Sequence, residues 1–233
     1  MSRLLEVRGL TIGHGDRILY RDVSFDICAG DCIMLCGANG SGKTTLMRML
    51  SSSCTDAIQP QLEGLEIVMI PARIPKVKGF TLKEFIRTSC YRQSDMGGHL
   101  SQDQEISLNK AMSRLGLSDL ADRDISTLSD GEFQKAGIAA ALVRKASIIM
   151  LDEPTAFLDA ENRIAVLSTL KTICHPEENV EYDHIAPAII FSTHDLQDGL
   201  AVASKVIALG ADKTFRCTSE SKEEAVSTIF HKK

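Results

Sequence analysis

The feature that most constrains this chain of 233 residues is a glycine-rich stretch that follows an apolar segment and precedes a helix-forming one. Residues 32–36 are continuously apolar, which is typical of a strand covered on both faces. The next residues, 37–44, match the phosphate-binding pattern G-x-x-x-x-G-K-[ST] without deviation, and a helix is expected from about Lys43 to Leu50. This order of strand, loop and helix predicts an α/β chain with a phosphate site.

Each part of this loop has a chemical role. Glycines let successive backbone N–H groups point inward at the positive end of the following helix, which creates an anion site. We expect the Lys43 ammonium to reach the terminal phosphates and the Thr44 hydroxyl to bind Mg²⁺. The expected ATP-binding residues of this stretch are Gly37, Ala38, Asn39, Gly40, Ser41, Gly42, Lys43, Thr44 and Thr45.

Two adjacent acids follow a second apolar segment, residues 148–151. Asp152 and Glu153 stand where this predicted strand ends, and ligands bind beyond the carboxyl ends of parallel strands. Asp152 is suited to hold Mg²⁺, while Glu153 is suited to polarise the water that attacks a γ-phosphate. The alternative is a pair of solvated acids at the rim of the sheet. Because the phosphate loop precedes these acids in the chain, we expect a Mg²⁺-dependent nucleotide site.

The remaining pattern gives the fold class. The first 36 residues are strand-rich with a turn at 13–15, and residues 81–145 are mostly helical with capping-box patterns that begin at Thr81 and Ser129. Further strands are expected at 147–151, 188–192 and 206–209, with helices at about 161–173 and after 221. We predict one α/β domain over residues 1–233, a P-loop nucleotide hydrolase with an N-terminal antiparallel β portion and a helical subdomain inserted at about 80–145.

Composition excludes other classes. The chain carries 26 Lys and Arg against 31 Asp and Glu, and a formal charge of −5 disfavours broad nucleic-acid binding. Apolar runs such as 136–143 are well short of the roughly 18 residues that suggest a membrane span. The first residues lack the apolar core of a secretory signal, so we expect a cytoplasmic protein.

Evenly spaced Cys28, Cys32 and Cys36 raise the alternative of a metal site. They run into the apolar strand, where small thiols usually pack as hydrophobic groups. Packing is therefore the favoured interpretation.

Five segments together resemble the nucleotide-binding subunit of an ABC transporter. They are residues 37–44, 128–132, 151–154, 157–159 and 192–195. Ser129 precedes Asp152 by 23 residues and His194 follows it by 42, and both spacings are usual in that family. Residues 125–135 and 154–163 are most similar to the ATPases of iron-siderophore, haem and cobalamin importers.

The resemblance implies ATP hydrolysis with Mg²⁺ by a homodimer at the cytoplasmic face of a membrane. It implies two transmembrane permease subunits and a periplasmic or surface substrate-binding protein as partners, and no nucleic acid. Glu153, His194 and Lys43 would be catalytic, and Asp159 would be the D-loop acid that links the two ATP sites, or else a helix N-cap. Residues expected to contact the ATP of the opposite subunit are Ser129, Asp130, Gly131 and Glu132.

Two positions depart from the family pattern. His14 stands where the family usually stacks an aromatic residue on adenine, and an imidazole offers less stacking area. Ala72 and Arg73 stand near the place of the family's Q-loop glutamine. The basic and apolar segment 73–80 is expected to dock the permease, with a solvated loop as the alternative.

The function that the resemblance favours is uptake of an iron-siderophore, haem or cobalamin-type chelate. The alternatives are an exporter ATPase, a soluble ABC ATPase of the iron–sulfur assembly type, and a regulatory subunit that does not hydrolyse ATP. The last is opposed by the presence of Lys43, Asp152, Glu153 and His194.

Overall fold

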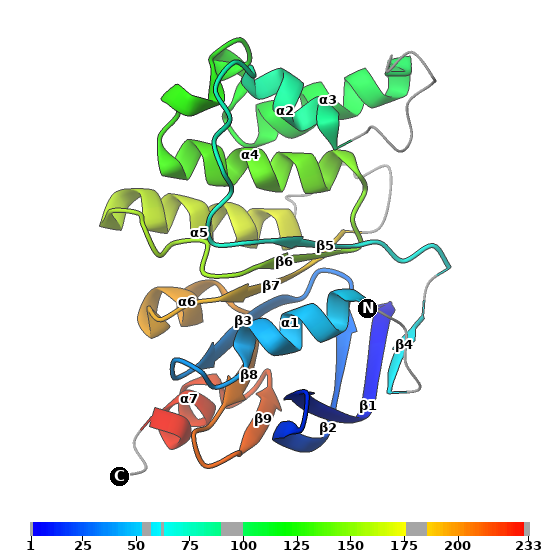
Figure 1. Cartoon of the computed structure of the whole chain (residues 1–233), viewed down its shortest axis with the longest axis vertical. Coiled ribbons are helices and arrows are strands. Elements are labelled where there is room, and N and C mark those ends of the chain that lie inside the picture. The colour runs from blue at the N-terminus through cyan, green and yellow to red at the C-terminus, as the bar shows by residue number, and fades with distance from the viewer. Residues whose placement is uncertain (1, 53–56, 62, 90–99, 176–185, 231–233) are drawn as a thin grey trace.

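In the computed structural model, which describes residues 2–52, 57–61, 63–89, 100–175 and 186–230, a six-stranded sheet forms the centre of the protein (Figure 1). In spatial order its strands are β5 (Ile67–Ile70), β6 (Ile148–Leu151), β7 (Ala188–Ser192), β3 (Cys32–Gly37), β8 (Lys205–Leu209) and β9 (Phe215–Thr218). The strands from β5 to β8 pair in parallel, and β9 pairs antiparallel with β8. The predicted parallel sheet is therefore confirmed.

The central strands are buried on both faces because two separate cores lie against the sheet. In β3, Cys32, Met34 and Cys36 belong to one core, while Ile33 and Leu35 belong to the other. Since successive side chains of a strand point to opposite faces, this alternation places the sheet as the middle layer of the fold. It also explains why the strand sequences are continuously apolar.

Helices cover one face of the central sheet. A second sheet, together with one helix, covers the other face. Helices α4 (Asp130–Val143), α5 (Ala160–Cys174) and α6 (Leu196–Val202) contribute to the first core, together with α7 (Lys222–Phe230). Helix α1 (Lys43–Ser52) packs into the second core, where the antiparallel sheet β2–β1–β4 also lies. The strand-rich start that the sequence predicts forms this antiparallel sheet.

The antiparallel sheet is built on a long hairpin. Strands β1 (Arg3–His14) and β2 (Arg17–Cys28) are joined by a two-residue turn, and β4 (Ile58–Pro60) pairs with β1. The turn expected at 13–15 lies at residues 15 and 16, because Gly13 and His14 still pair across the hairpin as the last residues of β1. Its position sets the edge of the nucleotide site described below.

Three α-helices and two short 3-10 helices, η1 (Ser118–Leu120) and η2 (Ile125–Thr127), lie between β5 and β6 in the described residues. The α-helices are α2 (Leu82–Thr88), α3 (Gln102–Arg114) and α4, and Figure 1 shows them at one end of the long axis. The expected capping boxes at Thr81 and Ser129 are confirmed, and a third box at Ser101, completed by Gln104, was not predicted. The α/β class with inserted helices is confirmed, while the subdomain limits at 80 and 145 stay a prediction.

Three strands escaped prediction, namely β4, β5 and β9. They have three or four residues each, which is too few for a periodic pattern to appear. Their pairing partners define them as strands. In the described part of the chain, no helix is long and apolar enough to cross a membrane.

Candidate functional site

The phosphate-binding loop joins β3 to α1 at the carboxyl edge of the central sheet. Gly42 has a φ of +104°, and a Cβ there would lie 2.7 Å from Leu19 Cδ1. At Gly37 a Cβ would lie 2.5 Å from Ser41 Oγ and 2.7 Å from the Leu209 carbonyl oxygen. Only glycine fits these two positions, so the turn that presents backbone N–H groups depends on them.

Lys43 is buried at the start of α1, with 6% of its surface exposed. Its Nζ donates to the carbonyl oxygens of Gly37 at 2.9 Å and Ala38 at 3.3 Å. Burial lowers the pKa of Lys43, and the carboxylates of Glu153 and Asp152 act in the opposite direction. The ammonium is thus held over the loop, where a phosphate would provide the counter-charge.

Oxygen ligands converge beside this lysine. The Thr44 hydroxyl donates to Asp152 Oδ2 at 2.7 Å, and the Ser192 hydroxyl donates to Asp152 Oδ1 at 2.9 Å. These groups come from the first residues of α1 and from the ends of β6 and β7. A hydroxyl and a carboxylate are the ligands that Mg²⁺ prefers, so the predicted pair Thr44 and Asp152 fits this ion.

Glu153 and His194 face one another at the same edge. His194 Nε2 lies 2.7 Å from Glu153 Oε1, and the Glu153 N–H donates to Ser192 Oγ at 2.8 Å. Their side chains keep 31% and 48% exposure, so water reaches the carboxylate. The structure therefore brings together Lys43, the adjacent acids Asp152 and Glu153, and His194 from three distant parts of the sequence.

A cavity of about 370 Å³ lies over the loop. Its described lining consists of His14, Arg17, Leu19, Asn39, Gly40, Gly42, Lys43, Thr44, Thr45 and Glu153. His14 is thus placed with the phosphate loop. Sequence reasoning missed Arg17 and Leu19, although Arg17 pairs with His14 across the end of the hairpin. The predicted hairpin turn was the signal that could have located Arg17.

The start of α4 lies apart from this cavity, since none of residues 129–132 is among its described lining. The Ser129 N–H donates to Glu132 Oε2 at 2.7 Å, and Ser129 Oγ accepts the Glu132 N–H at 3.2 Å. This bonding lowers the pKa of Glu132. Gly131 faces α5, where a Cβ on it would lie 3.4 Å from Asn162 Oδ1.

Asp159 is the N-cap of α5. Its carboxylate accepts the Asn162 N–H at 2.8 Å and the Asn162 side-chain amide at 2.9 Å, and these bonds lower the pKa of Asp159. The N-cap alternative is confirmed, while a role between two ATP sites stays a prediction.

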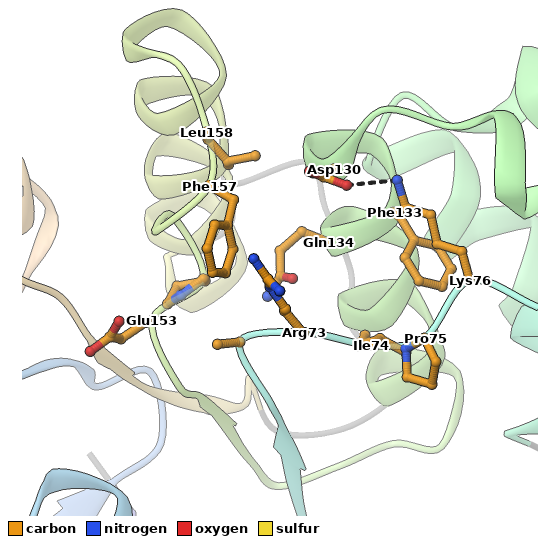
Figure 2. Close-up of a pocket in the computed structure, with 12 residues that line it drawn as sticks. Arg73, Ile74, Pro75, Lys76, Asp130, Phe133, Gln134, Glu153, Phe157 and Leu158 are labelled. Atoms are coloured by element: carbon orange, nitrogen blue, oxygen red, sulfur yellow. Dashed lines mark hydrogen bonds and ion pairs between the residues drawn. The ribbon is translucent and has the colours of Figure 1, made fainter.

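A second cavity, of about 540 Å³, opens between the segment after β5, the start of α4 and the loop after β6; we call it the Arg73 cavity (Figure 2). Its described lining consists of Ala72, Arg73, Ile74, Pro75, Lys76, Asp130, Phe133, Gln134, Glu153, Pro154, Phe157 and Leu158. Glu153 lines this cavity and the nucleotide cavity. Ala72 and Arg73, the residues near the expected place of the Q-loop glutamine, therefore line the same cavity as Glu153.

Within the described part of the chain, two polar groups of the Arg73 cavity have no acidic or carbonyl partner. The Arg73 guanidinium lies 4.1 Å from the centre of the Phe157 ring, and Phe157 is 52% exposed. Gln134 is only 7% exposed, and its Nε2 has no hydrogen-bond acceptor among the described residues. Figure 2 shows the Gln134 amide beside Arg73. Because an unpaired buried amide is costly, the cavity is suited to receive an acceptor.

Lys76 ties the same segment to α4. Its Nζ donates to the Leu128 carbonyl oxygen and to Asp130 Oδ1, each at 2.7 Å. Asp130, which the resemblance assigns to the opposite ATP, is therefore an ion-pair partner of Lys76 within the chain.

Two of the three evenly spaced cysteines pack as hydrophobic groups, as expected. Cys32 and Cys36 are buried in the apolar core, and burial raises the pKa of Cys36 to about 12. No group of three His, Cys, Asp or Glu suited to a metal occurs in the described residues.

Comparison with known proteins identifies relatives of this chain. The family described as ABC transporter matches residues 20–156. The ferric enterobactin transport ATP-binding protein FepC of Escherichia coli (strain K12) is 31% identical over 217 residues, covering 88% of this chain and 77% of that protein. The petrobactin import ATP-binding protein FpuD of Bacillus anthracis is 26% identical over 222 residues, covering 90% and 78%.

The fold also matches solved structures. A metal-chelate type ABC transporter in an inward-facing conformation superposes with a TM-score of 0.83 at 24% identity, covering 99% of this chain and 90% of that one. At this identity the likeness concerns the fold alone.

Proposed function

The chain belongs to the ABC transporter family and is an ATPase of that family, and we propose that it drives the uptake of an iron chelate across a membrane. The observation that carries this proposal is the similarity to siderophore import subunits over 88% and 90% of the chain. The cargo class is an iron-siderophore, with haem and cobalamin-type chelates as close variants. The chain itself would work at the cytoplasmic face of the membrane.

The geometry supports a hydrolytic role for the residues at the sheet edge. Thr44 and Asp152 would hold Mg²⁺, which supplies positive charge to the phosphates. Lys43 binds the terminal phosphates, and Glu153 accepts a proton from the attacking water. His194, at 2.7 Å from Glu153, orients that carboxylate and the water beside it.

A homodimer completes this site in the proposal. Residues 129–132 do not line the nucleotide cavity of their own chain among the described residues, yet they begin a capped helix whose positive end suits a phosphate. A second copy would bring that helix end to the ATP. Closing the dimer on ATP and reopening it after hydrolysis would move the membrane partner.

The Arg73 cavity is the proposed docking site for a cytoplasmic loop of the permease. Its lining is mostly apolar, and the nearby Val77 and Phe80 are 53% and 43% exposed. The Arg73 guanidinium and the Gln134 amide add two donors. The fitting occupant is a short permease segment that presents apolar side chains and one acceptor, such as a carboxylate, between these donors.

One purification tests the transport function. The chain is tagged at its C-terminus, the source membranes are solubilised in mild detergent, and the co-purifying proteins are identified by mass spectrometry. We expect two copies of a multi-spanning permease and, through it, an exported substrate-binding protein. An export-type permease with no binding protein would favour the exporter alternative.

Recovery from the soluble fraction alone would overturn the transport proposal and favour the iron–sulfur assembly type. Failure to hydrolyse ATP in the presence of the permease would instead favour the regulatory subunit.

A further inference from the structure

An ion-pair cluster outside both cavities joins the start of α5 to the segment that carries His194. Arg163 Nη1 lies 3.0 Å from Asp195 Oδ2, and Arg163 Nε lies 3.2 Å from Asp198 Oδ2. All three side chains are 30% exposed, so solvent screens these charges only in part. We propose that Arg163 is a positioning residue for ATP hydrolysis that acts through His194; this inference rests on the proposed role of His194.

On the α6 side, Arg163 holds the residue next to His194. The Asp195 carboxylate caps α6 by accepting the Asp198 N–H at 3.4 Å, and the Asp195 N–H donates to Thr193 Oγ1 at 3.0 Å. Thr193 is buried, with 3% exposure. His194 therefore lies between the buried Thr193 and Asp195, and Arg163 holds Asp195 in place. In this proposal the 2.7 Å contact of His194 with Glu153 depends on both neighbours.

On the α5 side, Arg163 is next in sequence to Asn162, the residue that contacts α4. Asn162 bonds to the Asp159 cap and lies against Gly131. If the first turn of α5 moved, the Arg163 side chain would therefore transmit the movement to Asp195. The cluster connects the elements that would sense the opposite subunit, at 129–132 and Asp159, with the histidine of the chain's own ATP site.

A purely structural role is the competing interpretation, because α5 and α6 pack together and the ion pairs would hold them together. Partly exposed ion pairs contribute little to stability, so stability alone cannot separate the two roles. ATPase kinetics can separate the two roles, because a residue that acts through His194 affects kcat only while His194 is present.

The test compares ATPase kinetics of the purified full chain with Arg163→Ala and Arg163→Lys. We expect Arg163→Ala to lower kcat by about 3- to 10-fold with little change in KM, and Arg163→Lys to recover part of the loss. Arg144→Ala is the matched control, because it breaks an ion pair with Glu66 whose side chains are 31% and 30% exposed. It should leave kcat unchanged.

The decisive measurement repeats Arg163→Ala in a His194→Ala background, where we expect no further loss of kcat. Equal losses in both backgrounds, or wild-type kcat in Arg163→Ala alone, would overturn the inference. If Arg163→Ala does not fold, Asp198→Asn removes one of the two ion pairs and should show the same dependence on His194. Wild-type kcat in His194→Ala would overturn the role of His194 itself, a different failure.

Discussion

Glu153 combines a proposed chemical role with an unusual backbone. Its φ is +50°, a conformation that residues other than glycine adopt at a cost of about 1–3 kcal/mol. The bond from its N–H to Ser192 Oγ and the contact with His194 hold it there. The strain is thus located at the residue that would act as base, where a fixed carboxylate direction favours catalysis.

Replacing Glu153 by Gln keeps its size and hydrogen-bonding shape but removes the proton acceptor. We expect Glu153→Gln to bind ATP, to stop hydrolysis and to accumulate as an ATP-bound dimer, measured by size-exclusion chromatography with bound nucleotide. Hydrolysis at the wild-type rate would show that another group is the base.

Lys43→Ala removes the buried cation from the phosphate loop. Charge-assisted hydrogen bonds contribute about 1.5–3 kcal/mol, so we expect ATP affinity to fall by roughly 10- to 100-fold, measured by calorimetry. Lys171→Ala changes an exposed lysine of α5 and is the control. Equal ATP affinity in the two variants would contradict the role of Lys43.

At the scale of elements, α2, α3 and α4 begin in the same way. Each has a hydroxyl N-cap and a Glu or Gln three residues later, and the two side chains satisfy the first backbone N–H groups reciprocally. In α4 this cap also sets the direction of residues 129–132. The local stability of α4 is therefore linked to the surface proposed to meet the second subunit.

The capping box of α4 makes a pH prediction. The pKa of Glu132 is lowered chiefly by its bond from the Ser129 N–H, so its contribution to stability is present above the ordinary pKa of 4.5 and is lost as pH falls through the folded-state pKa. Glu132→Gln keeps the acceptor and does not titrate. We expect its free energy of unfolding, from urea titrations, to fall less steeply below about pH 5.

Glu220→Gln, which changes an exposed residue after β9, is the matched control and should retain the wild-type slope. A wild-type slope in Glu132→Gln would mean that other acids carry the acid sensitivity. Glu84, Asp124 and Asp159 also have lowered pKa values and account for a remaining slope.

At the scale of the whole molecule, strand order assembles the site. Strands β6, β7 and β3 are neighbours in the sheet, so the segments that follow their carboxyl ends bring Asp152, His194 and the phosphate loop with Thr44 to one edge. The helices inserted between β5 and β6 place the Arg73 cavity next to this edge, and Glu153 lines both spaces. A partner bound in that cavity would lie close to Glu153, the proposed base for ATP hydrolysis.

Reversing the charge of Arg73 tests this docking surface. We expect Arg73→Glu to reduce permease recovery by at least about tenfold in the tagged purification, because a carboxylate would repel the proposed acceptor. ATP affinity should be unchanged, since Arg73 is not among the described lining of the nucleotide cavity. Arg216→Glu, at the exposed position of β9, is the control, and equal recovery with both variants would exclude this docking site.

Local sequence specified the phosphate loop, the two adjacent acids, the α/β class and the helix caps at Thr81 and Ser129, because each depends on neighbours within a few residues. Tertiary structure decided the short strands, whose pairing partners come from distant parts of the chain. It also decided that Ser192 bridges Asp152 and Glu153 and that Arg163 reaches the segment after His194, because such contacts depend on strand order and helix packing.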